Sequence, residues 1–212
     1  MRTKTEAKRG SIVDAAYELF GERGFGGATV SAVAERLGSS KATVYRYFSS
    51  KEDLFVAAMH GVPLEQTEEV WGALATSGDL RGTLVRFGAR FLELALSDKA
   101  IAIRRNSIAE GQRLGLGEFF YNGDVKVLWT KTADFLKHEM EAGRLRSADP
   151  WTAAMHLRGM LETDLTHRAL IGARIDGRPR QLRRYSRRAV DAFLRAYGEA
   201  EPGQAACDTR RF

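Results

Sequence analysis

The sequence predicts an all-α protein of about nine helices. Apolar residues recur at three- and four-residue spacing through most of the 212 positions, and no segment alternates as a half-buried strand would. Only 4 prolines interrupt long stretches rich in Ala, Leu, Glu and Arg, which are good helix formers. Residues that favour helix ends border these stretches, with Ser, Thr or Asp before a helix and Gly after it.

The composition limits the classes of protein. Apolar residues make up 44% and charged residues 28%, as in ordinary globular proteins. The net charge of +6 is compatible with a polyanionic partner but does not identify one. The single cysteine, Cys207, allows no intrachain disulfide and no thiolate metal cluster, which fits a reducing cytoplasm. We expect neither a signal peptide nor a membrane span, because no apolar run has the required length.

The N-terminal region predicts one medium helix followed by three short ones. The first spans 5–24 with a single apolar stripe, and Gly24 is a suitable residue to end it. Short helices then follow at 30–37, at 41–47 and from residue 51, with three residues as their N-caps: Thr29, Ser40 and Ser50. Asp53 stands three residues after Ser50, in the manner of a capping box.

The two helices around the turn "GSS" (38–40) form a helix-turn-helix pattern, whose second helix enters a DNA major groove. Val44 and Phe48 are four residues apart and share the inward face. The remaining side chains carry positive charge or hydroxyl groups, which suit phosphates and base edges. The alternative is a solvated helical hairpin with scattered aromatic residues.

The stretch "ELFGERGFGGATVSAVAERLGSSKATVYRYFSSKEDLFVAAM" closely resembles the N-terminal DNA-binding domain of TetR-family transcriptional regulators. This resemblance implies that Thr29, Lys51 and most of the "KATVYRYF" helix contact phosphates and bases. Position 46 varies in the family, so Arg46 is a candidate for reading a base. The full set of predicted DNA contacts is Thr29, Ser39, Ser40, Lys41, Ala42, Thr43, Tyr45, Arg46, Tyr47 and Lys51.

Longer amphipathic helices follow and predict a second domain. They are expected at 80–97, from residue 98, at 124–143, at 151–172 and at about 179–198. The glycine-rich break at 110–123 is the predicted gate or hinge. We therefore expect a helix-turn-helix DNA-binding domain at 1–60, a ligand-binding and dimerisation domain at 61–200 and a disordered tail at 201–212.

The resemblance also implies that the second domain is a helical ligand-binding and dimerisation bundle, and the block 100–160 is similar to the AefR-like subgroup. The last two helices are predicted to pair in a homodimer, because they are apolar on more than one face. The residues concerned are Trp151, Met155, Leu165, Leu170, Phe193 and Leu194.

A pocket for a small apolar effector is predicted between these helices. Its candidate lining is Phe87, Phe91, Phe120, Trp129 and Met155. The alternative is that these residues simply fill the core, as bulky side chains at helical spacing usually do.

Two polar groups of residues have structural interpretations. His156, Met160, Thr163 and His167 share a helix face, where a polar stripe in a dimer seam is the alternative to a metal site. The segment "RIDGRPRQLRRYSRR" (174–188) predicts a solvated face with dimer salt bridges, and a second nucleic-acid contact is its alternative. We predict no metal and no cofactor.

The sequence thus predicts a sequence-specific, DNA-binding transcriptional regulator, most simply a repressor released from its operator by a small apolar molecule. It predicts no catalytic residues and no enzyme activity. One alternative is a helical enzyme with an appended helix-turn-helix module, in which Glu110 or Glu162 would act as an acid or base. The other is a DNA-binding protein that responds to no ligand.

Overall fold

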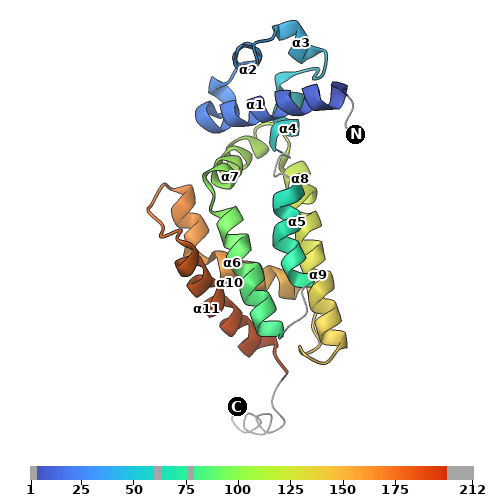
Figure 1. Ribbon diagram of the computed structural model, residues 1–212, viewed down its shortest axis with the longest axis vertical. Helices are drawn as coiled ribbons and strands as arrows, with labels where there is room; N and C mark the ends of the chain where they lie inside the picture. The colour runs from blue at the N-terminus through green and yellow to red at the C-terminus, as the bar shows by residue number, and fades with distance from the viewer. Residues whose placement is uncertain (1–3, 60–63, 76–78, 200–212) are drawn as a thin grey trace. The chain divides into compact units, whose positions relative to one another are not determined.

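The computed structural model describes residues 4–59, 64–75 and 79–199, and its regular elements in that part of the chain are helices, which confirms the all-α prediction (Figure 1). Strand-type pairing there is limited to one isolated bridge between Leu145 and Gly198. The predicted tail at 201–212, with Cys207, lies outside the described residues. The helices are α1 (Lys4–Gly27), α2 (Val30–Arg36), α3 (Lys41–Tyr45), α4 (Lys51–Met59), α5 (Leu64–Gly72), η1 (Ala73–Ala75), α6 (Leu80–Ala95), α7 (Asp98–Gly111), α8 (Gly117–Phe120), η2 (Tyr121–Val125), α9 (Lys126–Glu141), α10 (Pro150–Leu170) and α11 (Pro179–Tyr197).

The chain divides into two compact units. The N-terminal unit consists of residues 1–64 together with Ser97–Val125, and the C-terminal unit consists of Glu65–Leu96 together with Lys126–Phe212. The segment 97–125, which holds α7, α8 and η2, therefore packs with the first four helices. No helix within the described ranges is both long enough and apolar enough to cross a bilayer.

The N-terminal unit is built around the apolar stripe of α1. Ile12, Leu19 and Phe20 are almost completely buried, and they form one core with the inward residues of α2, α3 and α4. The Phe55 ring of α4 contacts the Phe20 ring edge to face, with their centroids 5.0 Å apart. Aromatic pairs of this geometry add to the burial of their apolar area. This core holds α2, α3 and α4 in a fixed relation to α1.

Several contacts attach the segment 97–125 to this core, including the packing of Ile103, Leu114 and Leu116. The Tyr17 hydroxyl donates to the Lys99 carbonyl oxygen at 2.8 Å. The buried Asn106 side chain donates to the Phe20 carbonyl oxygen at 3.0 Å. The Phe120 ring lies 6.1 Å from the Phe55 ring. Burial also raises the pKa of Tyr17 well above its ordinary value, so this phenol remains a donor at physiological pH.

In the C-terminal unit, α6 lies beside α11, and α10 packs against α6, α9 and α11 (Figure 1). Gly88 makes the close approach of α6 to its neighbours sterically feasible. A Cβ atom at this position would lie 2.6 Å from Leu161 Cδ2 and in collision with the Ser186 hydroxyl. That hydroxyl donates to the Val85 carbonyl oxygen at 2.8 Å, which satisfies a polar group inside the interface.

Most predicted helix ends are confirmed, with three local differences. Asp149 caps α10 through the Thr152 amide, with Pro150 in the first turn. Gly24 breaks α1 with φ 67°, but the chain makes one more turn to Gly27. The helix predicted at 41–47 is α3, which ends at Tyr45 with Arg46 as its C-cap. The predicted helix at 151–172 contains a kink at Thr163, where φ is 32° and ψ is −124°.

Candidate DNA-binding surface

Side-chain caps fix the N-termini of α2 and α3. Thr29 Oγ1 accepts a hydrogen bond from the Ala32 amide at 3.1 Å, and Ser40 Oγ accepts one from the Thr43 amide at 3.1 Å. Gly38 adopts φ 57°, a left-handed conformation that costs glycine little. The two contacts confirm the predicted N-caps, and the Ser40 cap fixes the start of α3 directly after the turn.

The two faces of α3 are clearly separated. Val44 and Phe48 are buried at 0% and 4% exposure. The opposite face carries Lys41, Ala42 and Arg46, which are exposed, and Tyr45, whose exposed fraction is 45%. Thr43 and Tyr47 lie at its edges and are partly buried. The structure thus brings the predicted contacts of the "KATVYRYF" helix together on one accessible face.

The cations of this region lie against aromatic rings. Lys41 Nζ is 5.7 Å from the Tyr45 centroid, and Arg46 Cζ is 5.9 Å from the Tyr47 centroid. Lys51, in the first turn of α4, has its Nζ 4.3 Å from the Phe25 centroid. Such contacts orient a cation without neutralising it. Within the described residues, Lys41, Arg46 and Lys51 make no ion pair, so their charges remain available to an anionic partner.

Ser39 differs from the other residues of the predicted set. Its hydroxyl oxygen is buried in the turn and has no hydrogen-bond partner among the described residues. The exposed Thr29 uses one oxygen lone pair in capping, and its hydroxyl proton remains able to donate to a phosphate. Ser40 Oγ accepts from the Thr43 amide and also shares a hydrogen bond of 2.9 Å with Thr43 Oγ1.

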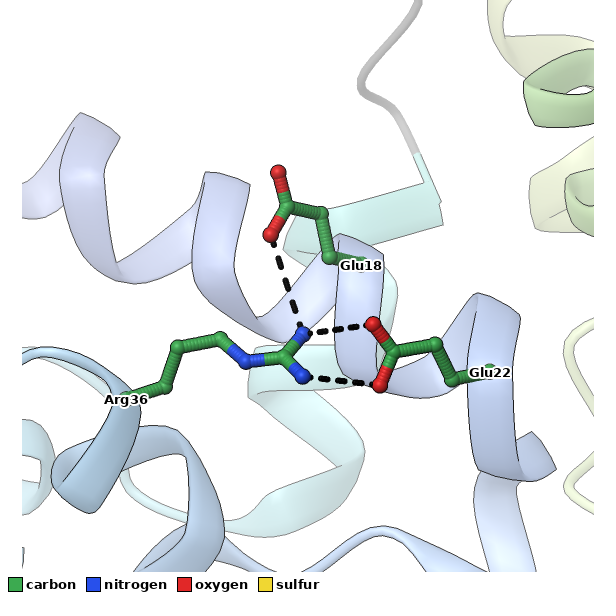
Figure 2. A network of polar contacts seen from close by, with 3 residues as sticks. All are labelled: Glu18, Glu22 and Arg36. Atoms are coloured by element: carbon green, nitrogen blue, oxygen red, sulfur yellow. Dashed lines mark hydrogen bonds and ion pairs between the residues drawn. The ribbon is translucent and has the colours of Figure 1, made fainter.

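Arg36 braces α2 against α1 (Figure 2). Its Nη1 and Nη2 donate to the two Glu22 carboxylate oxygens at 3.0 and 2.7 Å, and Glu18 approaches Nη1 at 3.7 Å. The hydrogen bonds from Arg36 hold the pKa of the Glu22 carboxyl below its usual range. The same pair raises the pKa of Arg36.

The N-terminus of α4 shows the predicted Ser50 cap, but the Asp53 carboxylate binds the Ser49 hydroxyl and not the Ser50 amide of a full capping box. Ser50 Oγ accepts a hydrogen bond from the Asp53 amide at 2.9 Å, and the Ser49 hydroxyl donates to the Asp53 carboxylate. The first turn of α4 is therefore fixed where Lys51 projects. The unpaired amides at this helix end favour an anion beside Lys51.

The predicted effector-binding residues separate into two groups. Phe87, Phe91 and Trp129 are buried and in mutual contact in the C-terminal unit, with ring centroids 5.1–6.2 Å apart. Phe120 belongs to the N-terminal unit, where it packs on Phe55. Met155 is partly buried on α10. The first group has the packing of a core, which is the alternative that the sequence left open.

Trp71 is a member of this aromatic cluster that the sequence did not single out. Its ring packs edge to face on Phe87 and on Trp129, and its indole N–H donates to Thr132 Oγ1 at 2.9 Å. Trp71 also borders a groove of about 410 Å³. The groove is lined by Glu68, Trp71, Gly72, Leu74, Ala75, Lys131 and Phe135. One signal was present in the sequence, since Trp71 is one of only three tryptophans.

The polar residues of α10 show no metal-binding arrangement. His156 Nδ1 is 2.5 Å from the Tyr197 hydroxyl, so this imidazole is engaged by α11. In the part of the chain that the structure describes, no three His, Cys, Asp or Glu side chains gather as metal ligands would.

Comparison with known proteins agrees with this geometry. Residues 12–58 match the profile of bacterial regulatory proteins of the tetR family, and residues 82–199 match the C-terminal domain of AefR-like transcriptional repressors. The activator FasR from Mycolicibacterium smegmatis is 35% identical over 83 residues, 39% of this chain and 38% of FasR. The regulator RutR from Escherichia coli K12 is 26% identical over 169 residues, 71% of this chain and 73% of RutR.

Solved structures show the same fold over nearly the whole length. A TetR-family regulator from Mesorhizobium loti aligns with a TM-score of 0.86 at 26% identity, covering 93% of this chain and all of that one. The flavonoid-responsive regulator FrrA aligns with a TM-score of 0.71 at 26% identity, covering 92% and 99%. With the AefR-like profile spanning more than half of the sequence, the chain belongs to the TetR family of bacterial transcriptional regulators.

Proposed function

We propose that this regulator is a repressor that binds a short palindromic operator as a homodimer and leaves it when a small apolar molecule binds the C-terminal unit. The exposed face of α3 carries the proposal, because it presents cations and hydroxyls opposite a fully buried apolar face. Comparisons support repression unevenly, since the AefR-like profile describes repressors while FasR is named an activator.

The DNA contacts divide into two roles. Lys51, Lys41 and Thr29 stand at helix N-termini, where they would hold phosphates and fix the register on the duplex. Arg46 and Tyr45 are exposed on α3, and Arg46 would read a guanine edge in the major groove. Ser40, Thr43 and Tyr47 would supply further hydroxyl contacts to the backbone. These residues lie in the proposed DNA-binding domain, 1–60.

We propose that α10 and α11 of two chains form the four-helix dimer seam. The exposed face of α10 carries His156, Gly159 and Thr163, with half-buried Met160 beside them. A glycine in the middle of an exposed helix lowers helix stability by about 1 kcal/mol, which is reasonable where another backbone must come close. A two-fold dimer would place two copies of α3 about 34–36 Å apart, one turn of DNA, or at a related spacing.

The effector would bind in the proposed ligand-binding domain, 61–200. The groove beside Trp71 and Phe135 has the size of a small-molecule site, and Trp71 joins it to the buried aromatic cluster. FrrA, of similar fold, is described as flavonoid-responsive, which supports a flat apolar ligand for this chain. Binding can release DNA only by the difference in its affinity for the two conformations.

We also propose that the chain is not an enzyme and acts in the cytoplasm, where an operator is accessible. The two candidate acid–base residues of the sequence have structural roles that favour this conclusion. Glu110 pairs with Arg113 at 2.5 Å, and Glu162 pairs with Arg158 at 3.4 Å. The family consists of regulators.

Selection of binding sites from a random duplex library tests the DNA proposal. The intact chain should enrich one roughly palindromic sequence, and its affinity for that sequence should fall steeply as salt rises. Recovery of no enriched sequence from correctly folded protein would overturn the proposal.

Trp129 allows the effector proposal to be tested with flat aromatic probes such as flavonoids. A ligand near the cluster should change Trp129 fluorescence and weaken operator binding together. Trp129→Phe should remove much of the optical change and keep the response. Because Trp129 is 2% exposed, Trp129→Ala should also cost about 3–5 kcal/mol of stability. A large stability loss with an unchanged ligand response would show that Trp129 is core alone.

A further inference from the structure

The N-terminal half of α11 carries a concentrated positive surface. Residues 180, 183, 184 and 187 are all arginines at the three- and four-residue spacing of one helix face, and all four are exposed; we call them the arginine face. Together with Arg178 and Gln181 they line a hollow of about 650 Å³.

This arrangement works against the stability of its own helix. Like charges three and four residues apart repel each other on a helix surface. Cations in the first turns also oppose the helix dipole, and the first turn of α11 contains no acidic residue. The N-cap residue, Arg178, makes no side-chain cap hydrogen bond. Several local rules are thus broken at one place, as is expected at functional sites.

Nearby carboxylates do not neutralise the arginine face. Asp176 is bound by Arg178 at 2.6 Å, which lowers the pKa of Asp176 to about 2. Asp191 lies one helical turn beyond Arg187 and pairs with Arg81 of α6 at 2.8 Å. Within the described residues, the four arginines form no ion pair.

The two carboxylates of α10 already have partners in their own chain. Glu162 pairs with Arg158 and Asp164 with Arg168, and these are the carboxylates that a dimer seam would offer. In addition, Asp191, one helical turn after Arg187, pairs with Arg81, so this face of α11 borders α6 at that turn. These pairings disfavour dimer salt bridges as the explanation of the charge.

We propose that the arginine face is a second nucleic-acid surface, which binds the phosphate backbone without regard to sequence. Guanidinium groups form bidentate hydrogen bonds with phosphate, and their spacing of about 5–6 Å along a helix suits successive phosphates. The hollow has no aliphatic or aromatic side chain in its lining, unlike most small-molecule pockets and membrane-inserting helices. The surface would keep the regulator bound to non-operator DNA while it searches for its operator.

Binding of a random-sequence duplex of about 30 base pairs to the full chain tests this proposal. The measurement is made in a Lys41→Ala/Lys51→Ala background, in which the contacts proposed for the helix-turn-helix are weakened. There, Arg180→Gln/Arg187→Gln should weaken binding about tenfold at about 50 mM NaCl and lower the salt slope by about 2. The control, Lys137→Gln/Arg174→Gln, removes the same charge from exposed positions of the C-terminal unit and should change neither quantity.

Three outcomes would overturn the proposal. If Arg180→Gln/Arg187→Gln and Lys137→Gln/Arg174→Gln have equal duplex affinities and equal salt slopes, only the net charge of the chain matters. If Arg180→Gln/Arg187→Gln loses binding to phosphatidylserine vesicles but keeps its duplex binding, the arginine face is a membrane contact. If Arg180→Gln/Arg187→Gln converts the chain to a monomer in sedimentation without DNA, the arginine face is a subunit contact. Operator selection by a chain with native α3 is independent of all three, so the proposed function can fail or stand separately.

Discussion

Single side chains on α3 and α4 carry the proposed discrimination between DNA sequences. Val44 and Phe48 anchor the inward face, so the positions of their outward neighbours follow from the helix geometry. Arg46 is exposed at the C-terminal end of α3, and among the described residues its side chain contacts the Tyr47 ring and forms no ion pair. Lys51 stands at the start of another helix, over Phe25. The proposed base contact and the proposed phosphate contact therefore lie on different elements.

This separation predicts opposite effects for two substitutions. Arg46→Ala should relax the preference at one base step by about 1–3 kcal/mol, while Lys51→Ala should weaken all sequences alike and lower the salt slope by about 1. Titration of the selected operator and single-step variants of it at several salt concentrations measures both. Equal losses on every sequence for Arg46→Ala would remove it from base reading. Thermal melts control for the lost contact of Lys51 with Phe25.

The bridge of Glu22 with Arg36 predicts a dependence of stability on pH. The pKa of Glu22 is below its ordinary value of 4.5 in the folded chain, so the bridge stabilises at neutral pH and is lost as pH falls through that lowered value. Wild type should therefore melt above Glu22→Gln at pH 7, and the difference should vanish in strong acid. Glu18→Gln is the control, because Glu18 makes only the 3.7 Å contact and should show a smaller difference. A difference independent of pH would contradict the assignment.

At the scale of elements, local chemistry allowed the helix ends to be predicted. Thr29, Ser40 and Asp149 cap helices through amides only three residues away, so the neighbouring sequence contains all the information. The segment 97–125 is different. Its apolar pattern predicts a buried face but not the partner that covers it, and the partner includes Tyr17 and Phe20, more than 80 residues earlier. The sequence grouped Phe87, Phe91 and Trp129, but for the same reason it did not predict that Trp71 joins them.

Asn106 tests how firmly the segment 97–125 belongs to the N-terminal unit. Asn106→Leu removes the buried donor to the Phe20 carbonyl oxygen and should lower the free energy of unfolding by about 1–3 kcal/mol, measured by urea denaturation. The amide exchange of α1 near Phe20 should also become faster. Asn122→Ala is the matched control, since Asn122 is exposed and its side-chain amide donates locally to Glu118 at 2.9 Å. Equal stability of the two variants would mean that the bond of Asn106 contributes nothing.

At the scale of the whole molecule, regulation requires coupling between two compact units that the chain joins three times. The joins fall at residues 64–65, 96–97 and 125–126. The last two flank a segment that packs on the DNA-binding helices but is continuous with α6 and α9 of the C-terminal unit. A ligand that shifts α6 or α9 would therefore also shift the segment 97–125, which is covalently continuous with both. That segment contacts α1 at Tyr17 and Phe20. The predicted hinge at 110–123 lies inside this segment, and Gly115 there has φ 67°.

Assembly is the last property at this scale, and Gly159 gives it a sharp test. A Cβ atom at Gly159 meets nothing within 4 Å in its own chain, so Gly159→Arg should leave the fold of one subunit intact. It should even favour α10, because glycine is a poor helix former. If α10 lies in the dimer seam, the long cation must separate the two subunits, and sedimentation at micromolar concentration should show a monomer with weakened operator binding. Gly177→Arg is the matched control, since Gly177 is also exposed with open space around it, but lies in the loop before α11. It should remain dimeric, and a Gly159→Arg variant that also remains dimeric would exclude this face of α10 from the seam.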